Sequence, residues 1–153
     1  MTTVISLVVV AVLVGVDQLT KFLVLTNIKP VNAVPVIDGI IQFRYVENTG
    51  AAFSMLSDKT WLLSLFTGLL ILLLSVYLIL GKHIGKLERV SLLLVIAGGL
   101  GNLIDRIFRG YVIDFIDYLF MNYAVYNFAD ILVTIGAVLL VISVLFVKGD
   151  RHE

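Results

Sequence analysis

The chain has 153 residues, of which 60% are hydrophobic, and its mean hydropathy is +1.08. A water-soluble domain of this length has too little interior to bury so much apolar surface, so lipid must cover part of it. The 11 basic and 11 acidic residues balance to a formal net charge of zero, which excludes the basic surface of a nucleic-acid-binding protein. The absence of cysteine excludes a disulfide framework, a thiolate nucleophile and a cysteine metal site. We therefore predict an integral membrane protein.

The first element is an apolar segment from Val4 to about Leu25, long enough to cross a bilayer. No basic residue precedes it and no small-residue cleavage pattern follows it, so we expect a mature helix and not a signal sequence. Asp17 and Lys21 lie four residues apart on one face of this helix. They are interpreted either as an ion pair that reaches the membrane interface or as support for an internal site.

The segment 27–58 changes character, because two prolines interrupt any helix there. Branched and aromatic residues at 34–37 and 39–46, with an Asp-Gly turn signal between them, predict a small strand pair outside the membrane. The run from Glu47 to Ser54 is small and polar. It suits either close backbone approach or an ordinary loop into the next helix.

Further apolar segments complete a set of four predicted spans. Each is long enough to cross the roughly 30 Å hydrocarbon core of a bilayer. The predicted spans are about 4–25, 61–80, 87–107 and 128–147. No internal repeat or composition break divides them, so we expect one domain over 1–153.

Basic residues are densest in the loop 81–89 and in the tail 148–153. Positive charge close to the ends of membrane spans marks the cytoplasmic side. We therefore expect both termini in the cytoplasm, with the regions 27–58 and 108–127 together on the outer face.

Polar side chains gather in the stretch 97–130, between two segments apolar enough to cross a bilayer. They comprise four carboxylates, two arginines and three asparagines, namely Asp105, Asp114, Asp117, Asp130, Arg106, Arg109, Asn102, Asn122 and Asn127. Polar groups at membrane depth are costly and mark functional sites. Asn102 with Asp105, and Asn127 with Asp130, are each three residues apart, so each pair shares a helix face. We expect the two faces to oppose each other.

The three glycines before Asn102 support this expectation. Gly98, Gly99 and Gly101 would let another backbone approach the third span closely, as small residues do at membrane helix contacts. Asp114, in the connection between the third and fourth spans, can then fold back over the same place.

Two carboxylates held close together in a partly dry site cannot both ionise easily, so the pair shares a proton. One then acts as general base on water while the other donates a proton to the substrate carbonyl or the leaving amine. This is the chemistry of an aspartic peptidase, and it needs neither a metal nor a cofactor. A small proton-coupled carrier or channel is the alternative. Against it, the charges cluster at one membrane face instead of stepping across the bilayer.

Five short motifs follow one another along the chain. They are Asp17-Gln18-Leu19-Thr20-Lys21, Asn48 to Phe53, Gly98 to Arg106, Val112-Ile113-Asp114-Phe115 and Asn127-Phe128-Ala129-Asp130. In type and order they resemble the motifs of the lipoprotein signal peptidases, also called signal peptidase II. The resemblance implies an all-α membrane protein of four transmembrane helices, with a small extracytoplasmic β-region and an outer helical loop that clasps the substrate.

The resemblance also implies an activity and a location. It points to an aspartyl endopeptidase of the bacterial cytoplasmic membrane, with its active site near the outer face. Such an enzyme removes the signal peptide from a prolipoprotein by cutting just before a cysteine that carries diacylglycerol. The implied partners are this diacylated prolipoprotein and membrane lipid, without nucleic acid, and we expect a monomer.

Residue by residue, the resemblance assigns the catalytic pair to Asp114 and Asp130. It also implies residues that hold the substrate and residues that support the site. The implied substrate-binding residues are Asn48, Gly50, Asn102, Arg106 and Asn127, and the supporting residues are Asp17, Lys21 and Asp105.

Asp105 competes with Asp114 for the catalytic role. Arg106 and Arg109 lie close to Asp105 in the sequence and would keep it ionised and structural. Asp114 is surrounded by aromatic and branched residues, which favour a raised pKa. We predict Asp114 with Asp130 and keep Asp105 with Asp130 as the alternative, while Asp117 receives no role.

Overall fold

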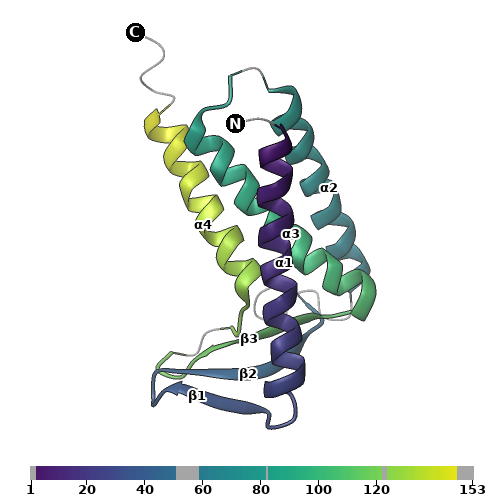
Figure 1. Cartoon of the computed structure of the whole chain (residues 1–153), viewed down its shortest axis with the longest axis vertical. Coiled ribbons are helices and arrows are strands. Elements are labelled where there is room, and N and C mark those ends of the chain that lie inside the picture. Colours follow the sequence, from purple (N-terminus) through teal and green to yellow (C-terminus); the bar gives the residue numbers. More distant parts are fainter. Residues whose placement is uncertain (1–2, 51–58, 82, 122–123, 148–153) are drawn as a thin grey trace.

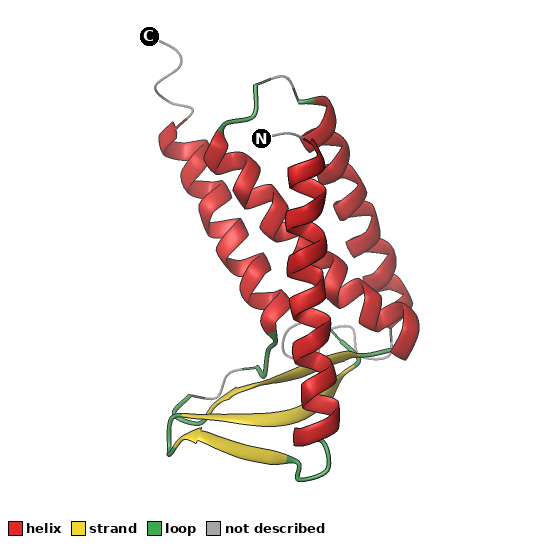
Figure 2. Cartoon of the chain, viewed as in Figure 1, coloured by secondary structure: helices red, strands yellow, loops and turns green. Residues whose placement is uncertain are grey.

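The computed structural model describes residues 3–50, 59–81, 83–121 and 124–147. These residues form a bundle of long helices with an antiparallel sheet at one end (Figure 1, Figure 2). The helices are α1 (Thr3–Leu23), α2 (Thr60–Leu80), α3 (Lys86–Arg109) and α4 (Phe128–Ile142). The strands are β1 (Ala33–Ile37), β2 (Ile41–Asn48) and β3 (Val112–Tyr118), in the order β1-β2-β3.

All four helices are long and apolar enough to cross a membrane. A π-helical turn continues α1 to Ile28 and another extends α4. The resulting candidate spans are Thr3–Ile28, Thr60–Leu80, Lys86–Arg109 and Phe128–Phe146. The prediction of four long apolar helices is thereby confirmed, and the predicted bounds agree with these candidate spans to within a few residues. Large apolar side chains such as Trp61 and Phe66 of α2 are exposed, as expected for surfaces that face lipid.

Helix α3 lies at the centre of the bundle and packs against each of the other three helices. Its three glycines face three different neighbours. A Cβ atom at Gly99 would lie 3.1 Å from Ile71 of α2, and one at Gly101 would lie 2.5 Å from Oδ2 of Asp17 in α1. A Cβ atom at Gly98 would collide with the backbone carbonyl of Ala129 in α4. The predicted close approach at these glycines is confirmed, and it involves three helices.

The predicted strand pair is present as β1 and β2, joined by a turn in which Gly39 has a φ of +71°. A third strand, β3, pairs with the other edge of β2 and was not predicted. Phe43 of β2 and Phe115 of β3 pack edge-to-face, with ring centroids 5.8 Å apart. Phe115 also joins a small buried cluster with Val24, which ties the sheet to the end of α1.

The connection between α3 and α4 differs from the expectation. Its described residues form β3, a turn at 119–121 and a short bridge between Ile116 and Tyr126, with no helix among them. The implied outer helical loop is therefore not found in the described part of this connection. The free edge of β2 satisfies the backbone groups of 112–118 across strands, so this segment needs no helical hydrogen bonds.

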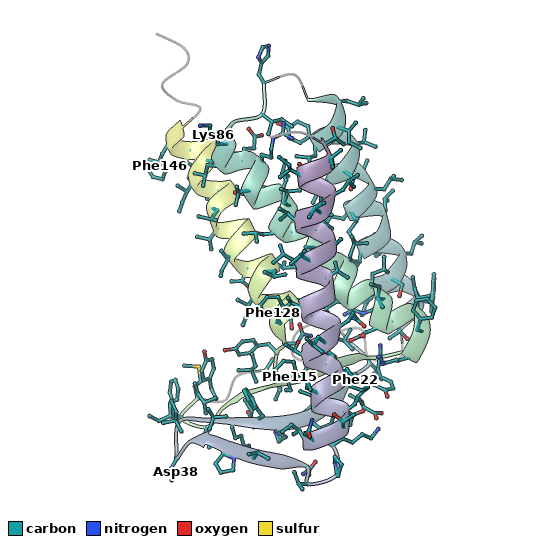
Figure 3. All side chains as sticks on the ribbon, viewed as in Figure 1. Phe22, Asp38, Lys86, Phe115, Phe128 and Phe146 are labelled. Carbon is teal, nitrogen blue, oxygen red and sulfur yellow. The ribbon has the colours of Figure 1, made fainter. Side chains whose placement is uncertain are left out.

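Both the start of α1 and the end of α4 lie at the end of the bundle away from the sheet (Figure 1). In Figure 3, Phe128 marks the end of α4 next to the sheet, and Phe146 lies at the opposite end, close to Lys86. The region 27–50 and the α3–α4 connection thus lie together at one end of the molecule, as predicted.

Candidate active site

A cavity of about 550 Å³ lies where α3, α4 and the sheet meet. Its lining residues are Asn48, Asn102, Arg106, Val112, Asp114, Tyr118, Met121, Ala124, Val125, Tyr126, Asp130, Ile131, Val133, Thr134 and Ile135. The polar members come from β2, α3, β3 and α4, so β2 meets three later, consecutive elements of the chain here. A largely apolar cavity with a few convergent polar groups is the usual form of a ligand site.

Asp114 stands in β3 with only 2% of its surface exposed. Its Oδ1 accepts a hydrogen bond from Nδ2 of Asn127 at 2.6 Å, and its Oδ2 accepts one from Nδ2 of Asn48 at 2.8 Å. In the β2–β3 register Asp114 is opposite Val46, so Asn48, two residues further along β2, lies on the same face of the sheet. The pairing of β2 with β3 therefore places the side chains of both Asn48 and Asp114 at the cavity.

Burial, followed by the nearby charge of Asp130, raises the pKa of Asp114 to about 7. The hydrogen bonds from Asn48 and Asn127 and the charge of Lys21 act in the opposite direction. A carboxyl group that titrates near neutral pH can both hold and release a proton under ordinary conditions.

Asp130 occupies the first turn of α4, where it forms a reciprocal cap with Asn127. The Asn127 Oδ1 accepts from the backbone N–H of Asp130 at 3.0 Å, and the Asp130 Oδ2 accepts from the backbone N–H of Asn127 at 3.1 Å. The remaining oxygen, Oδ1, accepts from Nδ2 of Asn102 at 2.7 Å. The three-residue spacing of Asn127 and Asp130 thus starts the helix and also fixes the carboxylate.

Two asparagine side chains join the aspartates into one network. Besides Asp114, the carboxamide of Asn127 donates to Oδ1 of Asn102 at 3.1 Å, and Asn102 in turn donates to Asp130. Each of the four carboxylate oxygens of Asp114 and Asp130 accepts a hydrogen bond from an N–H donor. The faces of α3 and α4 that the spacing predicted to oppose each other do so.

Arg106 reaches the same cavity from α3. Its Nη2 donates to the carbonyl of Gly50 at 3.2 Å, which ties the end of β2 to α3. Its Nε is buried and has no hydrogen-bond partner among the described residues. A buried donor without a partner is costly, and a substrate acceptor in the cavity would relieve that cost.

Asp105 lies behind the cavity and is held by two cations. Its Oδ1 pairs with Arg109 at 2.8 Å and its Oδ2 with Lys21 at 2.9 Å, and Oδ2 also accepts from the backbone N–H of Ile113 at 3.1 Å. Arg109 is a partner that the sequence spacing predicted. Arg106 instead bonds Gly50, and the second cation, Lys21, comes from a different helix.

The interpretation of Asp17 and Lys21 as an ion pair at the membrane interface is wrong. Both side chains are fully buried, with Nζ of Lys21 3.0 Å from Oδ2 of Asp17. Oδ1 of Asp17 accepts from the backbone N–H of Ala129 at 3.0 Å, so α1 caps the first turn of α4. Sequence spacing shows that the two residues share a helix face, but only the packing of α1 on α3 shows what that face meets.

Asp117 lies outside the cavity lining. It follows Asp114 by three positions along the strand, so the two side chains point to opposite faces of β3. Asp117 accepts from Gln42 at 2.7 Å and from Arg44 at 2.8 Å, both on the adjacent strand. It therefore has a role in cross-strand pairing.

The apolar wall of the cavity is the part that sequence reasoning did not single out. Tyr118 and Met121 come from β3 and the turn after it, while Ile131 and Ile135 share one face of α4. The sequence signal for this wall was the spacing of Ile131 and Ile135, four positions apart and just after Asp130. Such pairs of apolar residues occur in any membrane helix, so the spacing alone does not indicate a cavity wall. Residues 51–53 of the predicted Asn48 to Phe53 motif lie outside the described residues.

Among the described residues, no group of three or more His, Cys, Asp or Glu side chains is arranged to hold a metal ion. The charged side chains that line the cavity, among the described residues, are Asp114, Asp130 and Arg106.

Two solved structures share this fold over nearly the whole chain. Both are described as bacterial membrane enzymes solved by the in meso method, one at 2.3 Å and one at 1.9 Å resolution. The first is 31% identical with a TM-score of 0.89 and covers 99% of this chain and 93% of its own. The second is 32% identical with a TM-score of 0.83 and covers 94% of each chain.

Sequence relatives point in the same direction. A lipoprotein signal peptidase of Streptococcus pyogenes serotype M2 (strain MGAS10270) is 43% identical over 130 residues, which is 85% of this chain and 86% of the relative. One of Clostridioides difficile (strain 630) is 36% identical over 144 residues, 94% of this chain and 97% of the relative. The family described as Signal peptidase (SPase) II matches residues 9–146. This multi-pass membrane protein therefore belongs to the signal peptidase II family and is an aspartic-type peptidase.

Proposed function

We propose that the protein removes the signal peptide from diacylglyceryl-modified bacterial prolipoproteins, cutting just before the lipidated cysteine. The names of its relatives, lipoprotein signal peptidases, support prolipoproteins as the substrate class. The observation that carries the proposal is the pair Asp114 and Asp130 on the wall of one cavity, with every carboxylate oxygen held by an N–H donor.

Asp114 and Asp130 share one proton and divide the acid and base roles. Asp130, at the positive end of a helix, is the ionised partner and takes a proton from water as the water oxygen attacks the scissile carbonyl carbon. Asp114 gives its proton to the carbonyl oxygen, which produces a tetrahedral gem-diol. The proton on Asp130 then passes to the leaving amine as the C–N bond breaks, and Asp114 recovers a proton from the diol.

The rest of the cavity holds the substrate. Asn48 and Arg106 lie beside the aspartates in the cavity lining and can donate hydrogen bonds to the peptide backbone of the substrate. The Nε of Arg106, which has no partner among the described residues, can donate to a substrate carbonyl. The apolar wall, which includes Met121, Ile131 and Ile135, suits the hydrocarbon of a substrate that arrives through the membrane.

The density of basic residues around 81–89 supports an orientation for the whole chain. In this orientation, both termini of the protein lie on the cytoplasmic side of the cytoplasmic membrane. We further propose that the protein is a monomer with a single domain. The sheet and the cavity lie at the outer face, where exported precursors arrive.

A precursor peptide that carries diacylglyceryl-cysteine, together with its unmodified twin, tests the function in detergent or proteoliposomes. We expect cleavage of the modified peptide only, and loss of about 10²- to 10⁴-fold in rate for Asp114→Asn and for Asp130→Asn. Asp117→Asn is the matched control, because its carboxylate lies on the opposite face of β3.

Asp105→Asn decides between the two candidate pairs, with thermal unfolding recorded to separate inactivity from misfolding. Cleavage by Asp114→Asn together with a folded but inactive Asp105→Asn would move the catalytic pair to Asp105 and Asp130. Proton flux in empty proteoliposomes that survives Asp130→Asn, without peptide cleavage, would favour a carrier.

A further inference from the structure

The ammonium group of Lys21 is buried in the protein and has three acceptors. Nζ lies 3.0 Å from Oδ2 of Asp17, 2.9 Å from Oδ2 of Asp105 and 3.0 Å from Oδ1 of Asn102. A lysine ammonium carries three N–H donors, so each donor has one acceptor. Two acceptors are carboxylates that balance its charge, but the third is a neutral amide that belongs to the active-site network.

This third contact fixes the orientation of the Asn102 carboxamide. Its Oδ1 accepts from Lys21 at 3.0 Å and from Asn127 at 3.1 Å, which leaves its Nδ2 facing Oδ1 of Asp130 at 2.7 Å. A flipped carboxamide would place its N–H groups against two other donors, with its oxygen against a carboxylate oxygen. The charged donor therefore excludes the orientation that would withdraw the hydrogen bond from Asp130.

We propose that Lys21 is a positioning residue for the aspartate pair, acting through Asn102 to hold the carboxylate of Asp130 in its reactive orientation. The inference rests on the proposed function and goes beyond a supporting ion pair. Helix α1 contributes no residue to the cavity lining. The inference nevertheless gives a residue of α1 a role in orienting the catalytic carboxylate of α4.

Lys21 also contributes to the charge that Asp114 experiences. The charged groups around Asp114 are Lys21 from α1, Arg106 from α3 and Asp130 from α4, with Asp17 and Asp105 behind Lys21. On β2, the neighbour of Asp114 is the neutral Asn48, and Glu47 pairs with Lys29. Because the positive charge of Lys21 lowers the pKa of Asp114, its removal raises that pKa.

Arg109 provides a matched control within the same cluster. It pairs with Oδ1 of Asp105 at 2.8 Å, much as Lys21 pairs with Oδ2 at 2.9 Å. Lys21 also contacts Asn102, whereas no contact between Arg109 and Asn102 occurs among the described residues. Both Lys21→Met and Arg109→Gln therefore remove one cation from Asp105. Of these two variants, Lys21→Met alone also removes the contact with Asn102.

The experiment measures kcat, KM and their pH dependence on the diacylated precursor peptide, with thermal unfolding of each variant. We expect Lys21→Met to lower kcat up to about 100-fold with little change in KM, since misplacement of a reacting group costs that much. Because the pKa of Asp114 rises, the alkaline limb of its kcat profile moves to higher pH. Arg109→Gln is expected to lower the unfolding temperature and to keep kcat and the pH profile.

A charge-balanced variant covers the case in which Lys21→Met does not fold. The double variant Lys21→Met/Asp17→Asn removes one charge of each sign and keeps an acceptor oxygen for the Ala129 N–H. We expect it to recover the unfolding temperature but not kcat.

Two results would overturn the inference. One is wild-type kcat and an unshifted pH profile in Lys21→Met or in the double variant. The other is an equal loss of kcat in Arg109→Gln. Either result, with Asp114→Asn and Asp130→Asn inactive, leaves the proposed function intact, whereas cleavage by both aspartate variants would remove the proposed function itself.

Discussion

Four carboxylates in the stretch 97–130 have four different environments. Asp105 is held by two cations, and Asp117 bonds across the sheet to Arg44 and Gln42. Asp114 accepts hydrogen bonds from two neutral amides, and Asp130 belongs to a helix cap. Ion pairs hold Asp105 and Asp117, whereas the direct side-chain donors to Asp114 and Asp130 are neutral amides, so environment and not residue type separates these carboxylates.

Asp114 gives the folded protein a stability that depends on pH. Its pKa is raised from the ordinary value of 3.8 to about 7, so the native state binds more protons than the unfolded state between these values. The contribution is fully present below the ordinary pKa and is lost as pH rises through about 7. We expect the wild-type unfolding temperature to fall more between about pH 5 and about pH 8 than that of Asp114→Asn. The measurement is the unfolding temperature of both proteins in detergent across this pH range. An equal dependence on pH in the two proteins would contradict the prediction.

At the scale of elements, α3 is the helix on which the site is assembled. It positions Asn102 and Arg106 at the cavity and presents glycines where α1, α2 and α4 come closest. Small residues allow membrane helices to approach closely, and that approach brings the first turn of α4 within reach of Asn102.

Gly98→Ala tests the contact between α3 and α4. A methyl group there would meet the carbonyl of Ala129 and lie 2.8 Å from Cγ2 of Val133, so the two helices must separate. We expect a loss of about 1 to 3 kcal/mol in unfolding free energy, as for other overpacked cores. Thermal or denaturant unfolding in detergent is the measurement, with peptide cleavage recorded in parallel.

Gly68→Ala is the control for that substitution. The nearest atom to a methyl group at Gly68 is Cδ2 of Leu103 at 3.8 Å, an ordinary van der Waals contact. A loss of stability in Gly68→Ala as large as that in Gly98→Ala would show that any added methyl group in this bundle is destabilising.

For the whole molecule, the two ends of the bundle differ in kind. The sheet and the cavity occupy one end, and the α2–α3 connection with Lys86 occupies the other (Figure 1, Figure 3). Under the proposed function, the end that holds the cavity faces the side of the membrane on which the precursor is presented.

The absence of cysteine allows a direct test of this orientation. We expect Asp38→Cys, in the exposed turn between β1 and β2, to react with a membrane-impermeant maleimide in intact cells. Lys86→Cys, at the far end of the bundle, should react only after the membrane is permeabilised. Labelling in the reverse pattern would place the sheet in the cytoplasm and contradict the proposed topology.

The four membrane helices can be read from the amino-acid sequence alone, because a segment of about 20 successive apolar residues is stable in a bilayer as a helix. The sequence also identified the strand pair from its turn signal and the helix faces of Asn102 and Asp130 from their spacing, since both signals are local. The resemblance, and not the spacing, pointed to Asn48 and Arg106. Local spacing placed Asn127 with Asp130 on one helical turn and predicted that their face opposes that of Asn102, but it did not specify which atoms would pair across the bundle.

The contacts between remote segments follow from tertiary packing and could not be predicted from local patterns. Residues 112–118 form strand β3 because they pair with the free edge of β2. In this strand the side chains of Asp114 and Asp117 point to opposite faces of the sheet. The burial of Asp17 and Lys21 depends on the close contact of α1 with Gly101 of α3. Hydrogen bonds and ion pairs across the bundle depend on distances between helices, and these distances are set by packing, which no single segment of the chain encodes.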